Sequence, residues 1–168
     1  MNDASHIFTL ANGRKVCVFT LPLDPSLIGT AQQKKVSFRC RRIFTDPKVE
    51  RTEKNVAILA RVHRAAVRSV IGPTDHIRLE AVYRYNYPKG TPKCRMIDGA
   101  TKGNGADADN IHKAVQDALG PLRNRKTGTC RGACLWEDDR LISTLVVKKR
   151  YTLKQPCIDI SVSKDEGD

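Results

Sequence analysis

The stretch HIRLEAVYRYNY, residues 76–87, alternates apolar and polar side chains almost without interruption. Alternation with a period of two is typical of a β-strand with one buried face, because successive side chains of a strand point to opposite sides of a sheet. We predict a half-buried strand here, with its tyrosines packed in the core rather than stacked on nucleic-acid bases. The predicted core face carries Ile77, Leu79, Ala81, Tyr83, Tyr85 and Tyr87.

Helical periodicity before and after this strand predicts two main helices. The first begins at Asp46, a residue type that caps helices well, and runs to about Val70. Its apolar residues fall on one face and His63 lies among them, so we expect His63 to be a core histidine rather than a ligand. The second helix, residues 110–119, has five apolar residues at helical spacing and ends before a Gly-Pro pair.

Further strands complete an α+β fold. Asn12-Gly13 favours the two-residue type I′ turn of a hairpin, and residues 34–44 alternate apolar and basic side chains, which predicts one strand with a basic face. The predicted architecture is a single two-layer domain over residues 1–168, a mixed sheet with two main helices packed on it. Besides 76–87, the predicted strands are 6–10, 15–21, 34–44, 141–150 and 157–163.

The charge balance points to a polyanionic partner. The 168 residues include 30 Lys and Arg against 18 Asp and Glu, a formal net charge of +12, which favours nucleic acid. Aromatic residues are only 5% of the chain, so the backbone of a duplex is a better match than stacked single-stranded bases. The residues expected to bind DNA are Arg39, Arg41, Arg42, Lys54, Arg61, Arg68, Arg123, Arg125 and Lys126.

Other classes of protein are disfavoured. No apolar run is long enough to span a bilayer and the polar start is unlike a signal peptide, so we expect a cytoplasmic protein with no membrane partner and no small-molecule cofactor. Without a secretory signal, the six cysteines are expected to be reduced thiols. Cys130 and Cys134 are four residues apart, but no further ligand pair accompanies them, which argues against a zinc site.

Acidic residues cluster at two places in this basic chain: Asp107 with Asp109, and Asp138 with Asp139. Carboxylates held close together repel unless a cation lies between them, and such oxygen-rich sites suit Mg²⁺ or Mn²⁺. A basic surface combined with an acidic metal site favours metal-dependent phosphodiester hydrolysis. Three of these acids also have an ordinary alternative: a helix cap for Asp109, and a turn for Asp138 and Asp139. Asp107 has no such alternative.

Three motifs around these acids resemble the RusA family of Holliday junction resolvases. They are DADNIHK (107–113), DAL (117–119) and WEDDRLI (136–142), followed by a strand with Val-Val-Lys. The resemblance covers most of the chain after about residue 18. Two features depart from the family pattern: an extra N-terminal hairpin, about 1–21, and a longer basic inserted loop, about 120–135.

The resemblance implies a small homodimeric α+β endonuclease that binds four-way DNA junctions in recombination and repair and makes paired Mg²⁺-dependent cuts. Lys113 would be catalytic, although an ordinary helical ion pair with Asp117 is its alternative role. The implied metal-binding and catalytic residues are Asp107, Asp109 and Asp139, with Lys113 as a catalytic residue and Asp138 and Asn110 as additional candidates.

Two alternative functions remain open at this point: a metal-dependent nuclease for other branched DNA, and a non-catalytic nucleic-acid-binding protein whose acids are caps and turns. The second alternative does not explain why both acid pairs and Lys113 occur together. Ile58 and Val62 lie off the apolar stripe of the first helix and are candidate contacts in the homodimer.

Overall fold

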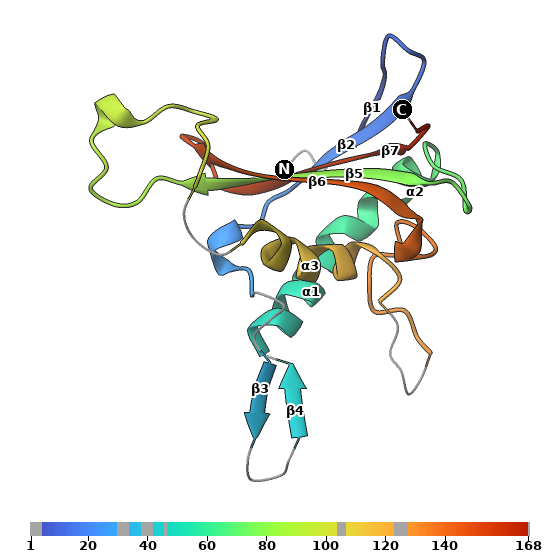
Figure 1. Ribbon diagram of the computed structural model, residues 1–168, viewed down its shortest axis with the longest axis horizontal. Coiled ribbons are helices and arrows are strands. Elements are labelled where there is room, and N and C mark those ends of the chain that lie inside the picture. Colours follow the sequence, from blue (N-terminus) through green and yellow to red (C-terminus); the bar gives the residue numbers. More distant parts are fainter. Residues whose placement is uncertain are drawn as a thin grey trace.

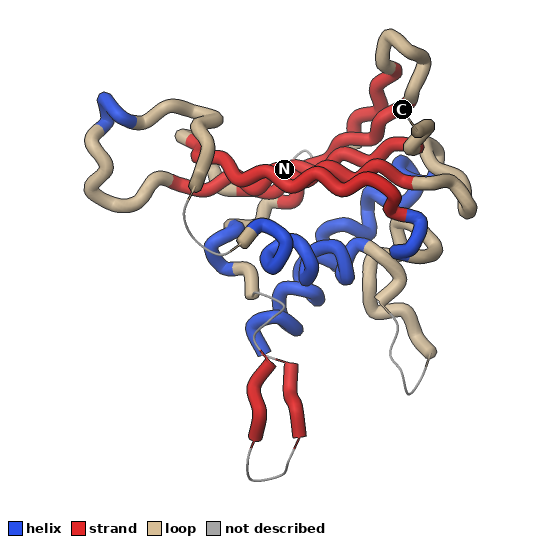
Figure 2. The backbone as a smooth tube through the Cα atoms, in the orientation of Figure 1, coloured by secondary structure: helices blue, strands red, loops and turns tan. Residues whose placement is uncertain are grey.

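A five-stranded mixed sheet with helices on one of its faces forms the body of the protein (Figure 1, Figure 2). The computed structural model describes residues 5–29, 34–37, 42–45, 47–103, 107–122 and 128–167, and only the backbone of 34–37 and 42–45. The strands are β1 (His6–Thr9), β2 (Lys15–Leu21), β3 (Lys34–Ser37), β4 (Arg42–Thr45), β5 (Ile77–Asn86), β6 (Ile142–Thr152) and β7 (Cys157–Lys164). The helices are α1 (Pro47–Ala60), α2 (Arg64–Arg68) and α3 (Ala108–Leu119), with 3-10 turns η1 (Pro25–Leu27), η2 (Arg61–His63), η3 (Lys93–Arg95) and η4 (Asp139–Leu141). The predicted α+β class, with two main helices on a mixed sheet, is confirmed.

The sheet has the strand order β1-β2-β7-β5-β6. β5 pairs antiparallel with β7 on one side and parallel with β6 on the other. A parallel neighbour cannot be reached by a tight turn, so the chain must cross over the sheet between the two strands. α3 lies in this crossover and packs beside α1 on the same face of the sheet (Figure 2).

β5 buries the face that its alternation predicts. Tyr87 is the exception: it lies beyond the end of β5, is half-buried, and stacks on Tyr151 with ring centroids 4.3 Å apart. Alternate residues of β2 and β7 extend the buried face on one side of β5. The fully or almost fully buried residues on this face are Cys17, Phe19, Leu21, Ile77, Leu79, Ala81, Tyr83, Tyr85, Ile158, Ile160 and Val162.

The long helix predicted between Asp46 and Val70 is present but divided. α1 passes through the 3-10 turn η2 into α2, and Asp46 itself lies outside the described residues. His63, in η2, is 2% exposed and stacks on Phe19 with ring centroids 4.3 Å apart, which confirms a core histidine. None of the helices in the described part of the chain is long and apolar enough to cross a bilayer.

The first hairpin closes through a different turn from the predicted one. Gly13 has a positive φ of +83° but Asn12 does not, and Leu10 N donates to Arg14 O at 2.9 Å. A three-residue loop therefore replaces the type I′ turn. The Asn12 side chain accepts a hydrogen bond from Arg14 N at 3.1 Å, which stabilises the wider loop.

Residues 34–44 do not form the single predicted strand. β3 and β4 pair antiparallel as a separate hairpin that projects from the helical layer (Figure 1). A single strand outside the main sheet would leave its backbone N–H and C=O groups without partners. The hairpin pairs these groups between its two strands. Arg39 and Arg41 lie outside the described residues, and only the backbone of Arg42 is described.

Candidate active site

α3 carries Asp109, Lys113 and Asp117 along one polar face. Its N-cap is Asp107 rather than Asp109, yet the Asp107 side chain makes no capping hydrogen bond. Asp107 and Asp109 are both exposed. Residues four apart are neighbours on a helix, and Lys113 Nζ lies 3.8 Å from Asp117 Oδ1. The carboxylates at the start of α3 are therefore available to a ligand.

The opposite face of α3 is anchored to the sheet by His112. This side chain is 1% exposed, and its Nδ1 lies 2.8 Å from the hydroxyl of Tyr83 on β5. Burial lowers the pKa of His112 to about 4, so the imidazole is neutral near pH 7. Our prediction of the core missed His112, although it lies three residues before Val115 and seven before Leu119 and therefore shares their helical face.

The C-terminal end of α3 is capped by backbone groups from a distant segment, residues 131–135. Ala133 N donates to Ala118 O at 2.7 Å, and Leu135 N donates to Leu119 O at 3.0 Å. The last carbonyl groups of a helix have no partner within the helix, so these bonds satisfy acceptors that would otherwise need water. The cap fixes the position from which the chain continues to Trp136 and η4.

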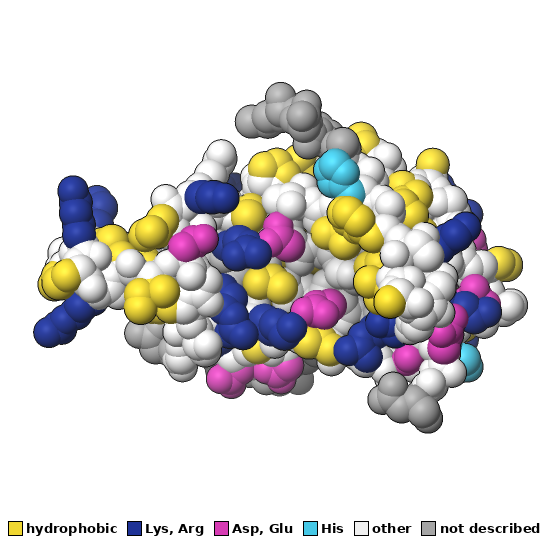
Figure 3. All heavy atoms as spheres, turned by 90° about the horizontal axis from the view of Figure 1, so that it is seen from above, with side chains coloured by type: hydrophobic (Ala, Val, Ile, Leu, Met, Phe, Trp, Pro, Cys, Tyr) yellow, Lys and Arg dark blue, Asp and Glu magenta, His cyan; other side chains and the backbone are white. Residues whose placement is uncertain are grey.

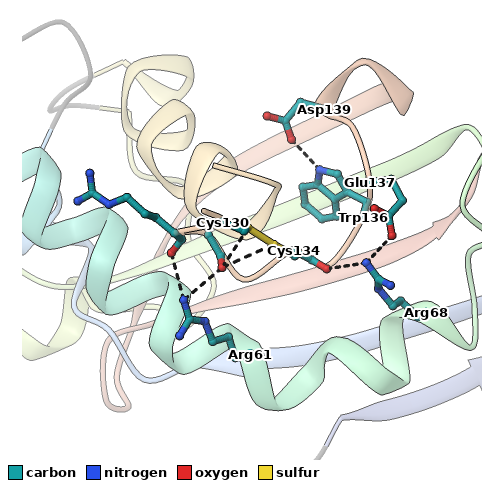
Figure 4. Close-up of a disulfide and its surroundings, with 9 residues drawn as sticks. Arg61, Arg68, Cys130, Cys134, Trp136, Glu137 and Asp139 are labelled. Atoms are coloured by element: carbon teal, nitrogen blue, oxygen red, sulfur yellow. Dashed lines mark hydrogen bonds and ion pairs between the residues drawn. A yellow bond between two sulfur atoms is a disulfide. The ribbon is translucent and has the colours of Figure 1, made fainter. Parts of the chain in front are cut away.

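Two arginines of the helical layer hold this capping segment (Figure 4). Arg61 Nη2 donates to the carbonyl groups of Arg131 and Gly132 at 3.3 and 3.5 Å. Arg68 Nη2 donates to Cys134 O at 3.2 Å and pairs with Glu137 at 2.6 Å. Both were expected among the DNA-binding residues, and the structure gives them a role in holding the loop. Their contact with DNA stays a prediction.

Cys130 and Cys134 are joined in a disulfide within the same segment (Figure 4). The prediction of reduced thiols is wrong for this pair, because the turn through Gly132 brings the two side chains together. Cys134 has a left-handed backbone, with φ +54°. Among the described cysteines, Cys17, Cys94 and Cys157 are free thiols.

Asp139 is held against the end of α3 by Trp136 and Gly120. Trp136 is 2% exposed, and its Nε1 donates to Asp139 Oδ1 at 2.7 Å (Figure 4). A Cβ at Gly120 would lie only 2.1 Å from that oxygen, so the absence of a side chain at Gly120 makes room for the carboxylate. Burial raises the pKa of Asp139, the Trp136 hydrogen bond lowers it, and nearby Asp117 raises it further.

Asp138 has a structural role next to Asp139. Its carboxylate accepts a hydrogen bond from Arg140 N at 2.9 Å, which caps η4, and it also pairs with the Arg140 guanidinium at 2.8 Å. These hydrogen bonds lower the pKa of Asp138. The turn expected as the alternative role of this acid is therefore present, whereas Asp139 keeps its second carboxylate oxygen for other partners.

The proposed acids do not converge within this chain. Asp107 and Asp109 lie at the start of α3, and Asp139 packs on Gly120, eleven residues after Asp109. Eleven residues of helix span roughly 16 Å. Within residues 5–29, 47–103, 107–122 and 128–167, the side chains form no group of three His, Cys, Asp or Glu able to hold a metal ion.

Asp117 lies between these two groups, and the sequence reasoning did not select it as a site residue. It is half-buried, and burial raises its pKa while Lys113 lowers it. Its negative charge also raises the pKa of Asp139 and of Glu53 on α1. The signal that could have found it is its spacing of eight residues from Asp109, which places both on one helical face.

The remaining candidates are peripheral or outside the described residues. Asn110 is half-buried in the first turn of α3, and Lys54 is exposed on α1. Arg123, Arg125 and Lys126 lie outside the described part of the chain.

A family model matches most of the chain. The family model described as "Endodeoxyribonuclease RusA" matches residues 25–163. This range begins after β2 and includes α1, α3, the capping segment and all of β7 except its last residue. A search of curated proteins finds no match.

Replacing Gly120 by Ala should destabilise the protein by about 1–3 kcal/mol, the usual range for overpacking a close contact. Urea unfolding, followed by the fluorescence of Trp136, measures this change. Gly103→Ala is the matched control, because a Cβ there meets no atom within 4 Å. The control should stay within about 0.5 kcal/mol of wild type. Equal unfolding midpoints for Gly120→Ala and wild type would contradict the packing described at Asp139.

Proposed function

Since this chain belongs to the RusA family of endodeoxyribonucleases, which resolve Holliday junctions with a divalent metal ion, we propose that its metal is Mg²⁺, that Asp107 and Asp109 bind the ion at the start of α3, and that Asp139 binds a metal ion or substrate at the other end of the helix. The observation that carries the proposal is the start of α3, where exposed Asp109 precedes Lys113 by one turn on the polar face and exposed Asp107 occupies the N-cap. The reaction is hydrolysis of phosphodiester bonds in DNA.

The donor chemistry at the start of α3 fits Mg²⁺. This ion prefers oxygen ligands and is commonly held by one or two carboxylates, with water and substrate phosphates as its other ligands. Asp107 and Asp109 are exposed, and the Asp107 side chain is not used to cap the helix. Bound Mg²⁺ would offset phosphate charge and lower the pKa of an attacking water. Mn²⁺ is the alternative ion, because it also favours oxygen ligands.

Lys113 is proposed to place its ammonium group against the scissile phosphate, where negative charge grows in the transition state. Its side chain is 67% exposed, and Asp117 at 3.8 Å holds it along the polar face. Asp139 is proposed to act from the far end of α3. Trp136 occupies its Oδ1, which leaves Oδ2 as the atom available to a metal ion or to substrate.

We also propose that the protein works as a homodimer on four-way junctions. Two symmetric cuts within one binding event require two sets of site residues, and closed two-fold symmetry is the commonest way to supply them. Ile58 and Val62 are 53% and 64% exposed and lie about one turn apart, which supports them as interface residues. Such a substrate would place the protein at the DNA of the nucleoid.

Asp107→Asn and Asp139→Asn should each abolish cleavage and leave junction binding intact, because a lost carboxylate removes a metal ligand and also weakens repulsion of phosphate. The measurement is gel analysis of labelled four-way junction, other branched DNA, duplex and single strand, with Mg²⁺ or with chelator. Glu166→Gln, an exposed acid near the C-terminus, is the control. Near wild-type cleavage by either variant would refute its assignment. Equal cutting of other branched DNA would support the broader nuclease, and no cutting by wild type would support the non-catalytic binder.

Lys113→Ala should slow single-turnover cleavage by about 10² to 10³ at saturating enzyme, the range for loss of one electrostatic contact in a transition state. Saturation removes binding from the measured rate. Lys148→Ala, which breaks an ion pair with Glu80 on the sheet, is the control and should cut at the wild-type rate. A folded Lys113→Ala protein that cuts within about threefold of wild type would return Lys113 to an ordinary ion pair with Asp117.

Wild-type protein should sediment as a dimer at micromolar concentration, and the double variant Ile58→Asp/Val62→Asp as a monomer, because charge on both sides would oppose an apolar contact. Leu27→Asp is the matched control, since Leu27 is also 64% exposed but lies in η1. A monomeric wild type, both alone and with junction DNA, would remove the dimer from the proposal.

A further inference from the structure

The connection between β5 and α3 forms a basic arm, residues 88–103, that extends from one end of the sheet (Figure 1). It contains four Lys or Arg residues and a single acid, Asp98. None of its cations is among the residues that we expected to bind DNA from the sequence. Figure 3 shows Lys and Arg side chains projecting from the left end of the molecule, where the arm lies.

The base of the arm is held firmly by the sheet. Gly99 N donates to Tyr151 O at 2.9 Å and Lys102 N donates to Lys149 O at 3.1 Å, so the returning chain pairs with the outer edge of β6. Asp98 Oδ1 accepts from Leu153 N at 3.0 Å. The one acid of the arm is therefore engaged in holding its base.

A tyrosine at the end of β5 fixes the middle of the arm. The Tyr87 hydroxyl donates to Ile97 O and accepts from Ile97 N, both at 2.9 Å. The Tyr87 ring stacks on Tyr151 with an interplanar angle of 14°. These contacts give the arm a defined conformation, and that conformation positions its cations.

The three cations of the outer arm are exposed. Lys89, Lys93 and Arg95 lie within seven residues, and within the described part of the chain no acidic side chain pairs with any of them. By contrast, Arg61 and Arg68 bind the capping segment. Unpaired like charges repel one another, and an anionic partner relieves that repulsion. A phosphate backbone supplies such a partner with regularly spaced charges.

The arm also leads directly into the candidate site. Gly103 precedes Asp107 by four residues, so their Cα atoms are separated by at most roughly 14 Å. DNA bound along the arm would therefore lie close to the first two acids of α3. We propose that the basic arm binds the phosphate backbone of the DNA beside the cleavage site, through Lys93 and Arg95 of η3 and Lys89. This inference rests on the proposed action on junction DNA.

The test measures how the dissociation constant of a labelled four-way junction varies with salt. Each phosphate contact contributes a slope of about −0.9 in log K against log[salt]. Lys93→Gln/Arg95→Gln should reduce the size of the slope by about 1.8, and Lys93→Gln alone by about 0.9. The matched control is Lys15→Gln/Lys164→Gln, which removes two cations at the opposite end of the sheet and should keep the wild-type slope.

An unchanged slope overturns the arm proposal while wild-type binding and cutting leave the proposed function standing. An equal loss of slope in the control variant also overturns it, since the effect would then come from net charge alone. A wild-type chain that binds no junction overturns both proposals.

Discussion

The parallel pairing of β5 with β6 is the constraint on which the rest of the structure depends. Because the two strands run in the same direction, the chain that leaves the end of β5 must return across the sheet to the start of β6. The basic arm begins this crossover, α3 spans its middle, and the segment 131–135 leads back toward β6. One connection therefore carries the proposed DNA contact, the acids and Lys113.

The rigidity of α3 determines which groups can act together. Its inner face is anchored through His112 and Tyr83, and its final carbonyl groups are capped by the segment that leads to Trp136. Asp109 and Asp139 are consequently held at opposite ends of one helix, with Lys113 on the polar face between them. The length of the helix keeps these carboxylates apart.

The positively charged side chains of this molecule fall into two groups. Arg61 and Arg68 donate to backbone carbonyl groups and thereby stabilise the loop that positions Asp139. Lys89, Lys93 and Arg95 of the arm are left without acidic partners among the described residues. The net charge of +12 counts both groups of positively charged side chains together. It indicates a polyanionic partner but does not distinguish the arginines that hold the protein together from the cations available to DNA.

The sequence by itself determined the features whose signals are local. Alternation over 76–87 predicted β5, helical spacing over 110–119 predicted α3, and the motif DADNIHK pointed to the family, because periods and short motifs depend only on neighbouring residues. Tertiary structure alone decided that 34–44 doubles back into a hairpin and that Asp139 packs on Gly120. Both outcomes depend on pairing and space between segments that a local pattern does not encode, since the free energy of such contacts exists only once the chain has folded.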